Sequence, residues 1–389
     1  FRYILILVKG VNIMYFDYAA TTPLDPVVKD HMVDIIHQQY GNPSSLHRYG
    51  RAARKLIDDA RGIIGRYFDV STDQVIFTSS ATEATNLAIK SSLFYNKQKG
   101  RHIITSNVEH SSVKNLLNEL EEHEGYEVTR LPVDENGLIQ AEQVRNALRD
   151  DTVLVTMMFV NNETGVMLPV YEVGELLVDH QAFFHVDAVQ AVGRMTFNLE
   201  DLCADYMSIS AHKLYGPKGI GALLKRADAP IKPLIYGGSH ELERRAGTEN
   251  VIHISAFGKA IERLAEQSNE RNIHCLQLKE LFINRMQQLE VPFAVNGSMN
   301  SVAHILNIYL PFKTSEILLT QLDLKDVHIS AGSACTAGAL QPSHVLMAMY
   351  GESSERVTHS IRISLSHMTT EDEVIAFANI LKDIYNNSL

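Results

Sequence analysis

Cysteine is scarce in this sequence, which contains three in 389 residues. Cys203, Cys275 and Cys335 lie far apart, and no CxxC pair is present. This spacing argues against a disulfide framework and against a cysteine-rich zinc site, because both need paired or clustered cysteines. A reducing compartment fits best, so we expect a cytoplasmic protein without a structural metal.

Positive charge and long apolar runs are also lacking. Lys and Arg total 35 against 46 Asp and Glu, which gives a formal net charge of -11, and no strong basic cluster offsets it. Nucleic acids bind to basic surfaces, so we expect no DNA partner. No apolar run approaches the ~20 residues that a membrane-spanning helix needs, so we expect no membrane association.

The length and a change of pattern predict two domains, because 389 residues exceed what one core usually serves. We expect a large domain over residues 14–260 and a smaller α+β domain over residues 261–389. The chain does not begin with methionine, and Met14 is its first. We therefore expect translation to start naturally at Met14, with residues 1–13 as an upstream extension.

Short apolar runs alternate with helical patterns in the first two thirds of the chain. This alternation predicts an α/β fold with a mostly parallel sheet that helices cover on both faces. Two of the expected helices are residues 52–68 and 170–180. The expected strands are residues 74–80, 101–107, 152–160, 182–188, 205–211 and 220–226.

Polar residues follow the expected strands, and chemistry in such sheets gathers at the carboxyl ends of the strands. In chain order they are a small-residue turn at Ser79–Thr82, then His110, Asn162, Asp187 and Lys213. Each alone has an ordinary interpretation, as a helix cap, a structural histidine, a turn former, a paired carboxylate or a solvated lysine. Together they provide what pyridoxal phosphate needs: a helix terminus for the phosphate, an acid for the ring nitrogen and a lysine for the aldehyde.

The third cysteine stands in an unusual stretch, "SAGSACTAGAL" at residues 330–340. Small neighbours give Cys335 too little apolar bulk for a structural role, whereas a reactive thiol needs access and room to move. We therefore expect a mobile loop over about residues 330–342 that carries a reactive cysteine.

At this point the chain resembles a known family, the cysteine desulfurases of the NifS/IscS class. These belong to the fold-type I pyridoxal-phosphate enzymes, in the class-V aminotransferase-like family. The resemblance covers nearly the whole chain from Met14. Its matching stretches are "YFDYAATTPLDP", "YGNPSSLHRYGRAAR", "SSATEATN", "VEHSSV", "VNNETGV", "HVDAVQAVG", "SISAHKLYGPKGIGAL", "RRAGTEN", "SAGSACTAG" and "SIRISLS".

The resemblance implies catalytic roles for several residues. Lys213 would bind the cofactor aldehyde covalently and remove the substrate's Cα proton. Asp187 would pair with the pyridine nitrogen, and Gln190 would hydrogen-bond the phenolic oxygen. His110 would stack on the ring and assist proton transfer. Cys335 would take sulfur from L-cysteine as a persulfide, leaving L-alanine.

The resemblance also implies binding residues and partners. Asn162 and Arg362 would hold the substrate carboxylate, since the planar fork of arginine matches two oxygens. Thr248 would reach the phosphate of a neighbouring subunit, which implies a homodimer. A sulfur-acceptor protein would receive the persulfide, for iron–sulfur cluster assembly, tRNA thiolation or other sulfur-containing cofactors. The implied phosphate ligands within the subunit are Ala81, Thr82, Ser210 and His212.

Other functions stay open on the same sequence. A selenocysteine lyase or an aminotransferase could use this fold, because one scaffold hosts many reactions. An aminotransferase would not need the "SACTAG" thiol, and a non-catalytic scaffold would not need Lys213 or Asp187. The chain departs from the family in "GGSHELE", where Leu242 and Glu243 replace an expected Arg and Gly. This change leaves the implied catalytic set intact.

Overall fold

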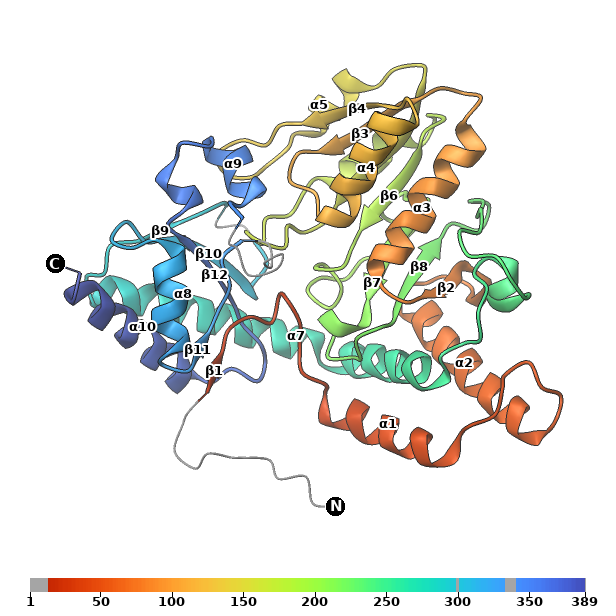
Figure 1. Cartoon of the computed structure of the whole chain (residues 1–389), viewed down its shortest axis with the longest axis horizontal. Coiled ribbons are helices and arrows are strands. Elements are labelled where there is room, and N and C mark those ends of the chain that lie inside the picture. Colours follow the sequence, from red (N-terminus) through yellow and green to blue (C-terminus); the bar gives the residue numbers. More distant parts are fainter. Residues whose placement is uncertain (1–12, 299–300, 333–340, 389) are drawn as a thin grey trace.

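The computed structural model describes residues 13–298, 301–332 and 341–388 (Figure 1). Two expectations fall outside this part of the chain. One is the upstream extension, of which the structure describes only Ile13. The other is the loop that carries Cys335, of which it describes residues 330–332 and 341–342.

A seven-stranded sheet forms the centre of the larger body (Figure 1). Its order is β2-β8-β7-β6-β5-β3-β4, and every neighbouring pair is parallel except the two pairs made by β8. The predicted mostly parallel sheet is therefore confirmed. The strands are β2 (Val75–Thr78), β3 (His102–Ser106), β4 (Glu127–Leu131), β5 (Thr152–Met158), β6 (Phe183–Asp187), β7 (Tyr206–Ser210) and β8 (Gly221–Lys225).

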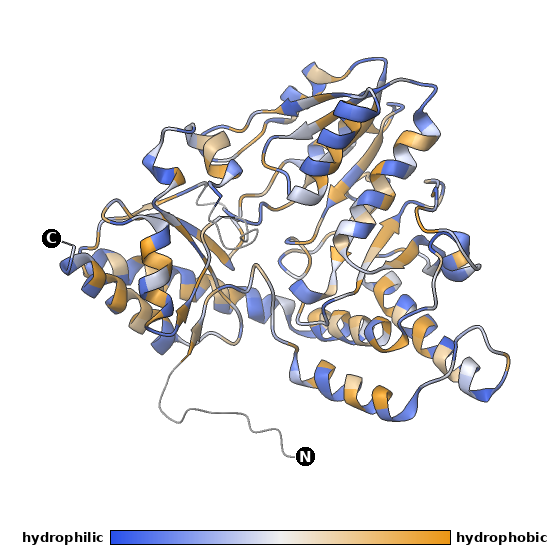
Figure 2. Cartoon of the chain, in the orientation of Figure 1, coloured by the Kyte–Doolittle hydropathy of each residue, from blue (hydrophilic) through white to orange (hydrophobic). Residues whose placement is uncertain are grey.

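Helices cover both faces of this sheet, because successive strand residues point to opposite sides. Ile103 belongs to a core cluster with residues of α3 and α4. Its neighbour Ile104 belongs to the cluster on the other face, with residues of α2, α5, α6 and α7 (Val251–Gln288). Figure 2 shows apolar residues concentrated on the strands and along stripes of the helices. The helices are α2 (Arg48–Tyr67), α3 (Ala81–Asn96), α4 (Ser111–His123), α5 (Ala141–Ala147) and α6 (Val170–Leu177).

A second core lies beside the first and comes mainly from the C-terminal third. It contains an antiparallel sheet of order β12-β10-β9, flanked by α8 and α10. β1 pairs in parallel with β11, so Met14 and Phe16 belong to this core. The elements are β1 (Met14–Tyr15), β9 (Ala294–Val295), β10 (Ile305–Tyr309), α8 (Ser315–Asp323), β11 (Val327–His328), α9 (His344–Tyr350), β12 (Ser360–Ser364) and α10 (Glu371–Asn386).

The 38-residue helix α7 (Val251–Gln288) joins the two cores, and Figure 1 shows it running along both. Phe257 of its first half packs in the first core, and Phe282 of its second half packs in the second. The predicted domain boundary after residue 260 falls inside this helix and stays a prediction. The shorter α1 (Pro26–Gln38) packs on α7 through Val28. No helix in the described part of the chain has both the length and the apolar character to cross a membrane.

Candidate active site

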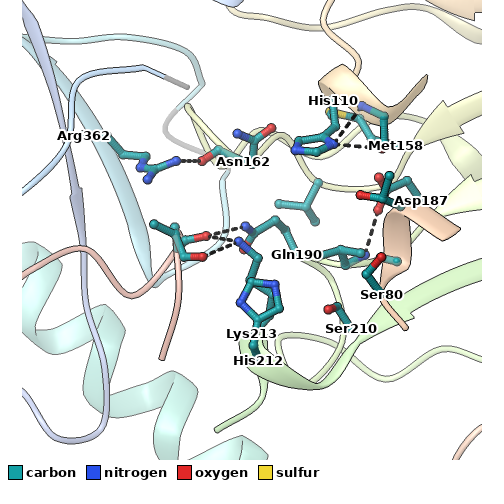
Figure 3. Close-up of a pocket in the computed structure, with 17 residues that line it drawn as sticks. Ser80, His110, Met158, Asn162, Asp187, Gln190, Ser210, His212, Lys213 and Arg362 are labelled. Atoms are coloured by element: carbon teal, nitrogen blue, oxygen red, sulfur yellow. Dashed lines mark hydrogen bonds between the residues drawn. The ribbon is translucent and has the colours of Figure 1, made fainter. Parts of the chain in front are cut away.

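A cavity of about 270 Å³ lies where the parallel strands of the central sheet end (Figure 3). Ten residues singled out from the sequence line it together. They end or follow β2, β5, β6 and β7, cap α4 or belong to β12. The roles implied for them stay predictions, but their meeting in one space is a finding. They are Ala81, Thr82, His110, Asn162, Asp187, Gln190, Ser210, His212, Lys213 and Arg362.

One end of the cavity is the first turn of α3. Ser80 caps this helix, and its Oγ accepts a hydrogen bond from the backbone N of Glu83 at 3.2 Å. The N–H groups of Ala81 and Thr82 precede the first intrahelical bond, so they remain available to an anion. Gly221 of β8 packs under the turn, where a Cβ would lie 2.8 Å from the backbone N of Ala81. This end fits a phosphate.

Asp187 provides the acid of the site. Its carboxylate accepts a hydrogen bond from the backbone N of Val189 at 3.0 Å, and the residue is almost fully buried. Burial raises the pKa of Asp187, while the charges of His110 and Lys213 act in the opposite direction. A buried carboxylate with so few partners needs a cation. A protonated pyridine nitrogen would provide one.

His110 stands at the start of α4 and lines the cavity beside Asp187 (Figure 3). Its Nδ1 lies 2.8 Å from Ser112 Oγ and accepts from the backbone N of Ser112 at 3.2 Å. These contacts fix the ring plane. Desolvation by the surrounding protein lowers the pKa of His110, which favours a neutral imidazole at neutral pH.

Lys213 follows β7 in a short 3₁₀ turn and reaches across the cavity. Its Nζ donates hydrogen bonds to the carbonyl oxygens of Ala19, at 2.6 Å, and Ala20, at 2.8 Å. Gln190 Nε2 donates to the same Ala19 oxygen at 2.9 Å. Burial, and next the positive charge of Arg362, lowers the pKa of Lys213 to about 8. The lysine is therefore much easier to deprotonate than a solvated one.

Arg362 of β12 provides a buried cation at the other end of the cavity. It is 2% exposed, and its guanidinium donates to the backbone oxygen of Asn162 at 2.9 Å and to Asp17 Oδ1 at 2.8 Å. Its Nε has no hydrogen-bond partner among the described residues. A substrate carboxylate would therefore compete with Asp17 for this arginine.

Several residues of the site were not predicted from the sequence. Ala19 and Ala20 supply the carbonyls that hold Lys213, and Asp17 pairs with Arg362. Glu109 lies fully buried behind His110, where burial raises its pKa to about 8. The sequence signal for them was membership in two stretches that resemble the family. Asp17, Ala19 and Ala20 lie in "YFDYAATTPLDP", and Glu109 lies in "VEHSSV".

Of the predicted residues, Thr248 does not line the cavity within this chain. Thr248 is exposed on the loop before α7, as a contact to another subunit would require, and that role stays a prediction. Cys335 lies outside the described residues. Of the other cysteines, Cys275 is fully buried in the second core, whereas Cys203 is only partly buried.

The departing stretch "GGSHELE" adopts a strained backbone. Glu241, Leu242 and Glu243 have φ values of 48°, 56° and 65°, a region that side chains other than glycine rarely occupy. Glu241 is held there by Arg61, with an Nη2–Oε1 distance of 2.6 Å, and by the backbone N of Phe77. Leu242 is left 62% exposed, so the change alters a surface and not the cavity.

Comparisons with known proteins agree with this geometry. The model of the aminotransferase class-V family matches residues 14–377. IscS 1 of Bacillus subtilis (strain 168) is 45% identical, with 95% of this chain and 98% of that protein covered. The cysteine desulfurase IscS of Dictyoglomus turgidum (strain DSM 6724 / Z-1310) is 41% identical, with 95% and 94% covered.

A solved structure shows the same likeness in three dimensions. A NifS-like protein matches with a TM-score of 0.90 and 33% identity, over 97% of this chain and 100% of that one. The family match spans both cores and all ten cavity residues. The chain therefore belongs to the class-V aminotransferase family and, within it, to the cysteine desulfurases of the NifS/IscS class.

Proposed function

We propose that this protein is an L-cysteine desulfurase that uses pyridoxal 5'-phosphate and takes the substrate's sulfur onto Cys335. The cavity is the observation that carries the proposal, because a lysine, a buried aspartate, a histidine and an arginine meet there. One L-cysteine and one Cys335 thiol would give one L-alanine and one Cys335 persulfide. The atoms and electrons balance, so no oxidant or reductant is needed.

Members of this family depend on pyridoxal 5'-phosphate, and the cavity fits this group. When bound, it withdraws electrons from the substrate and so makes the Cα proton acidic. The first turn of α3, with Ser210 and His212, would hold the phosphate. Asp187 would keep the ring nitrogen protonated, and Gln190 would hydrogen-bond the phenolic oxygen.

Lys213 would accept the Cα proton of the substrate. Only the neutral amine can do this, and a pKa of about 8 leaves roughly 10% of it neutral at pH 7, against less than 0.1% for a lysine of pKa 10.5. His110, neutral at the same pH and fixed by Ser112, would share in moving protons on the cavity side. The protein surroundings thus lower the pKa of both groups, which favours the neutral forms that can accept a proton.

Arg362 and Asn162 would orient the substrate through its carboxylate. The guanidinium is buried and already faces an anionic partner, Asp17, at 2.8 Å. Exchange of this partner for the substrate carboxylate would keep a charge-assisted hydrogen bond throughout. When substrate binds, the Asp17 carboxylate would hydrogen-bond to water instead, since its side chain is partly exposed.

An activity assay with two readouts tests the proposal. The purified protein, loaded with pyridoxal phosphate, should absorb visible light and release equal amounts of L-alanine and sulfide from L-cysteine in the presence of a thiol reductant. Lys213→Ala should do neither. A protein that stays colourless with added cofactor would indicate a scaffold, production of a 2-oxo acid would indicate an aminotransferase, and a strong preference for L-selenocysteine would indicate a selenocysteine lyase.

The proposal extends to location and partners. From Cys335 the sulfur would pass to an acceptor protein in the cytoplasm. A homodimer is supported by the exposed Thr248 and by large exposed apolar side chains on α1, on the segment after it and at the start of α2. Light scattering should give twice the chain mass, and Thr248→Ala should weaken cofactor binding. These exposed side chains are Val33, Ile36, Tyr40, Leu46 and Tyr49.

A further inference from the structure

The turn that carries Asn162 also carries a buried acid, Glu163, for which the proposed chemistry gives no role. Asn161 Oδ1 accepts hydrogen bonds from the backbone N of Glu163, at 2.9 Å, and of Thr164, at 3.0 Å. These bonds fix the turn that follows β5. Asn162 lines the cavity, whereas the side chain of Glu163 is fully buried.

Glu163 lies close to both ends of the segment that connects residues 332 and 341, and it is hydrogen-bonded at the second of them. Its Oε2 accepts a hydrogen bond from Ser343 Oγ at 2.5 Å, and Ser343 caps α9 just after this segment. Gly332, just before the segment, has a φ of 63°, and a Cβ there would lie 3.3 Å from the same Oε2. One carboxyl group therefore lies against the residues where the chain leaves and returns.

The same turn also contacts the buried arginine of the site. Arg362 donates through its guanidinium to the backbone oxygen of Asn162 at 2.9 Å. Its backbone N donates to the backbone oxygen of Ser330 at 2.7 Å. The arginine, the Asn162 turn and the entry to the cysteine segment thus form one connected unit.

A buried acid destabilises the fold through its desolvation, so a purely structural contact would not favour it. Glu163 Oε1 has no hydrogen-bond partner among the described residues, and an apolar residue would fill the space without that penalty. Burial raises the pKa of Glu163, because it penalises the charged form of the carboxyl group. Its specific bond to Ser343 is what an apolar residue could not supply.

We propose that Glu163 is a positioning residue for the sulfur-transfer step, which fixes both ends of the segment carrying Cys335 against the Asn162 turn. This inference rests on the proposed function, because it assumes that Cys335 accepts the sulfur. Glu163 acts through Ser343 and Gly332 and need not touch substrate or cofactor. A small misplacement of a reacting group costs up to about 100-fold in rate, so the effect should fall on sulfur transfer alone.

The test compares Glu163→Ala, Glu163→Gln and Ser343→Ala in the cofactor-loaded protein. Exchange of the Cα proton of L-alanine with deuterium reports on Lys213 and the cofactor, and needs neither sulfur nor Cys335. We expect Glu163→Ala to keep this exchange and the KM for L-cysteine within about threefold, and to lose about 10- to 100-fold in kcat for desulfuration. Glu163→Gln, which can still accept from Ser343, should recover most of that kcat, and Ser343→Ala should resemble Glu163→Ala.

Three outcomes would overturn the inference: an unchanged kcat in Glu163→Ala, a parallel fall of exchange, cofactor absorbance and thermal stability, or a Glu163→Gln variant no better than Glu163→Ala. If Glu163→Ala does not fold, Ser343→Ala carries the test, because it removes the same hydrogen bond. A wild-type protein that exchanges the proton of L-alanine but forms no persulfide would refute the proposed function itself, separately from the role of Glu163.

Discussion

Replacement of Lys213 by methionine should stabilise the cofactor-free protein at neutral pH. Burial lowers the pKa of Lys213 to about 8 from an ordinary 10.5. Below pH 8 this lowering of the pKa destabilises the folded protein by about 3 kcal/mol, because the unfolded chain holds the lysine proton more tightly than the folded one. Methionine keeps the length of the side chain and removes the charge. It also removes the hydrogen bonds to the Ala19 and Ala20 carbonyls, at about 1 kcal/mol each.

At pH 7 we therefore expect Lys213→Met to be more stable than the wild type by about 1 kcal/mol. The sign of this difference in unfolding free energy should depend on pH. Between pH 8 and pH 10.5 the unfolded lysine keeps its proton while the folded one has lost it, so the wild type gains stability relative to the variant as pH rises. The advantage of methionine should therefore shrink and then reverse near pH 9.

Urea unfolding of both cofactor-free proteins from pH 7 to pH 10 measures the difference. Lys218→Met, at an exposed lysine on the loop after Lys213, is the matched control and should show no such trend. A wild type that is more stable than Lys213→Met at pH 7, or a difference that stays constant with pH, would refute the argument that burial tunes this lysine.

Three further substitutions separate the roles within the site. Asp187→Asn should keep bound cofactor and lose about 100-fold or more in turnover, since removal of one preorganised charge typically costs that much; normal turnover per folded molecule would make Asp187 purely structural. Arg362→Ala should raise the KM for L-cysteine about 30-fold, equivalent to about 2 kcal/mol, in steady-state kinetics, and an unchanged KM would place the carboxylate site elsewhere. Cys335→Ser should bind cofactor and exchange the Cα proton yet form almost no alanine; after one turnover of the wild type, mass spectrometry should find the added sulfur on the Cys335 peptide, and sulfur on Cys203 or Cys275 would contradict this.

Residues at strand ends were predictable because parallel strands share one edge. Asp187 ends the apolar run of β6, and Lys213 comes three residues after the end of β7, so the sequence alone placed both at the same edge of the sheet. The direction of β8 was not predictable, because an apolar strand buried on both faces has the same pattern whether it runs parallel or antiparallel. The roles within the site came from the family resemblance and not from the pattern.

The missed residues act over long sequence separations. Asp17 meets Arg362 across 345 positions, and Ala19 meets Lys213 across 194. Nothing in the pattern around residue 17 indicates that this segment crosses to the second core, because β1 is only two residues long. The contact of Glu163 was not predictable for a related reason. Its partner Ser343 has the sequence pattern of an ordinary helix cap, and only the fold brings the two residues together.

The pairing of β1 with β11 sets an order of events during synthesis. Met14 and Phe16 leave the ribosome early, but the strand that pairs with them follows about 310 residues later, roughly 15 to 60 s at ordinary elongation rates. The first turn of α3, Asp187 and Lys213, which would hold the cofactor, are synthesised in between. Arg362, which would hold the substrate carboxylate, comes later. A chain still being translated therefore contains the proposed cofactor ligands before it contains the proposed substrate ligand.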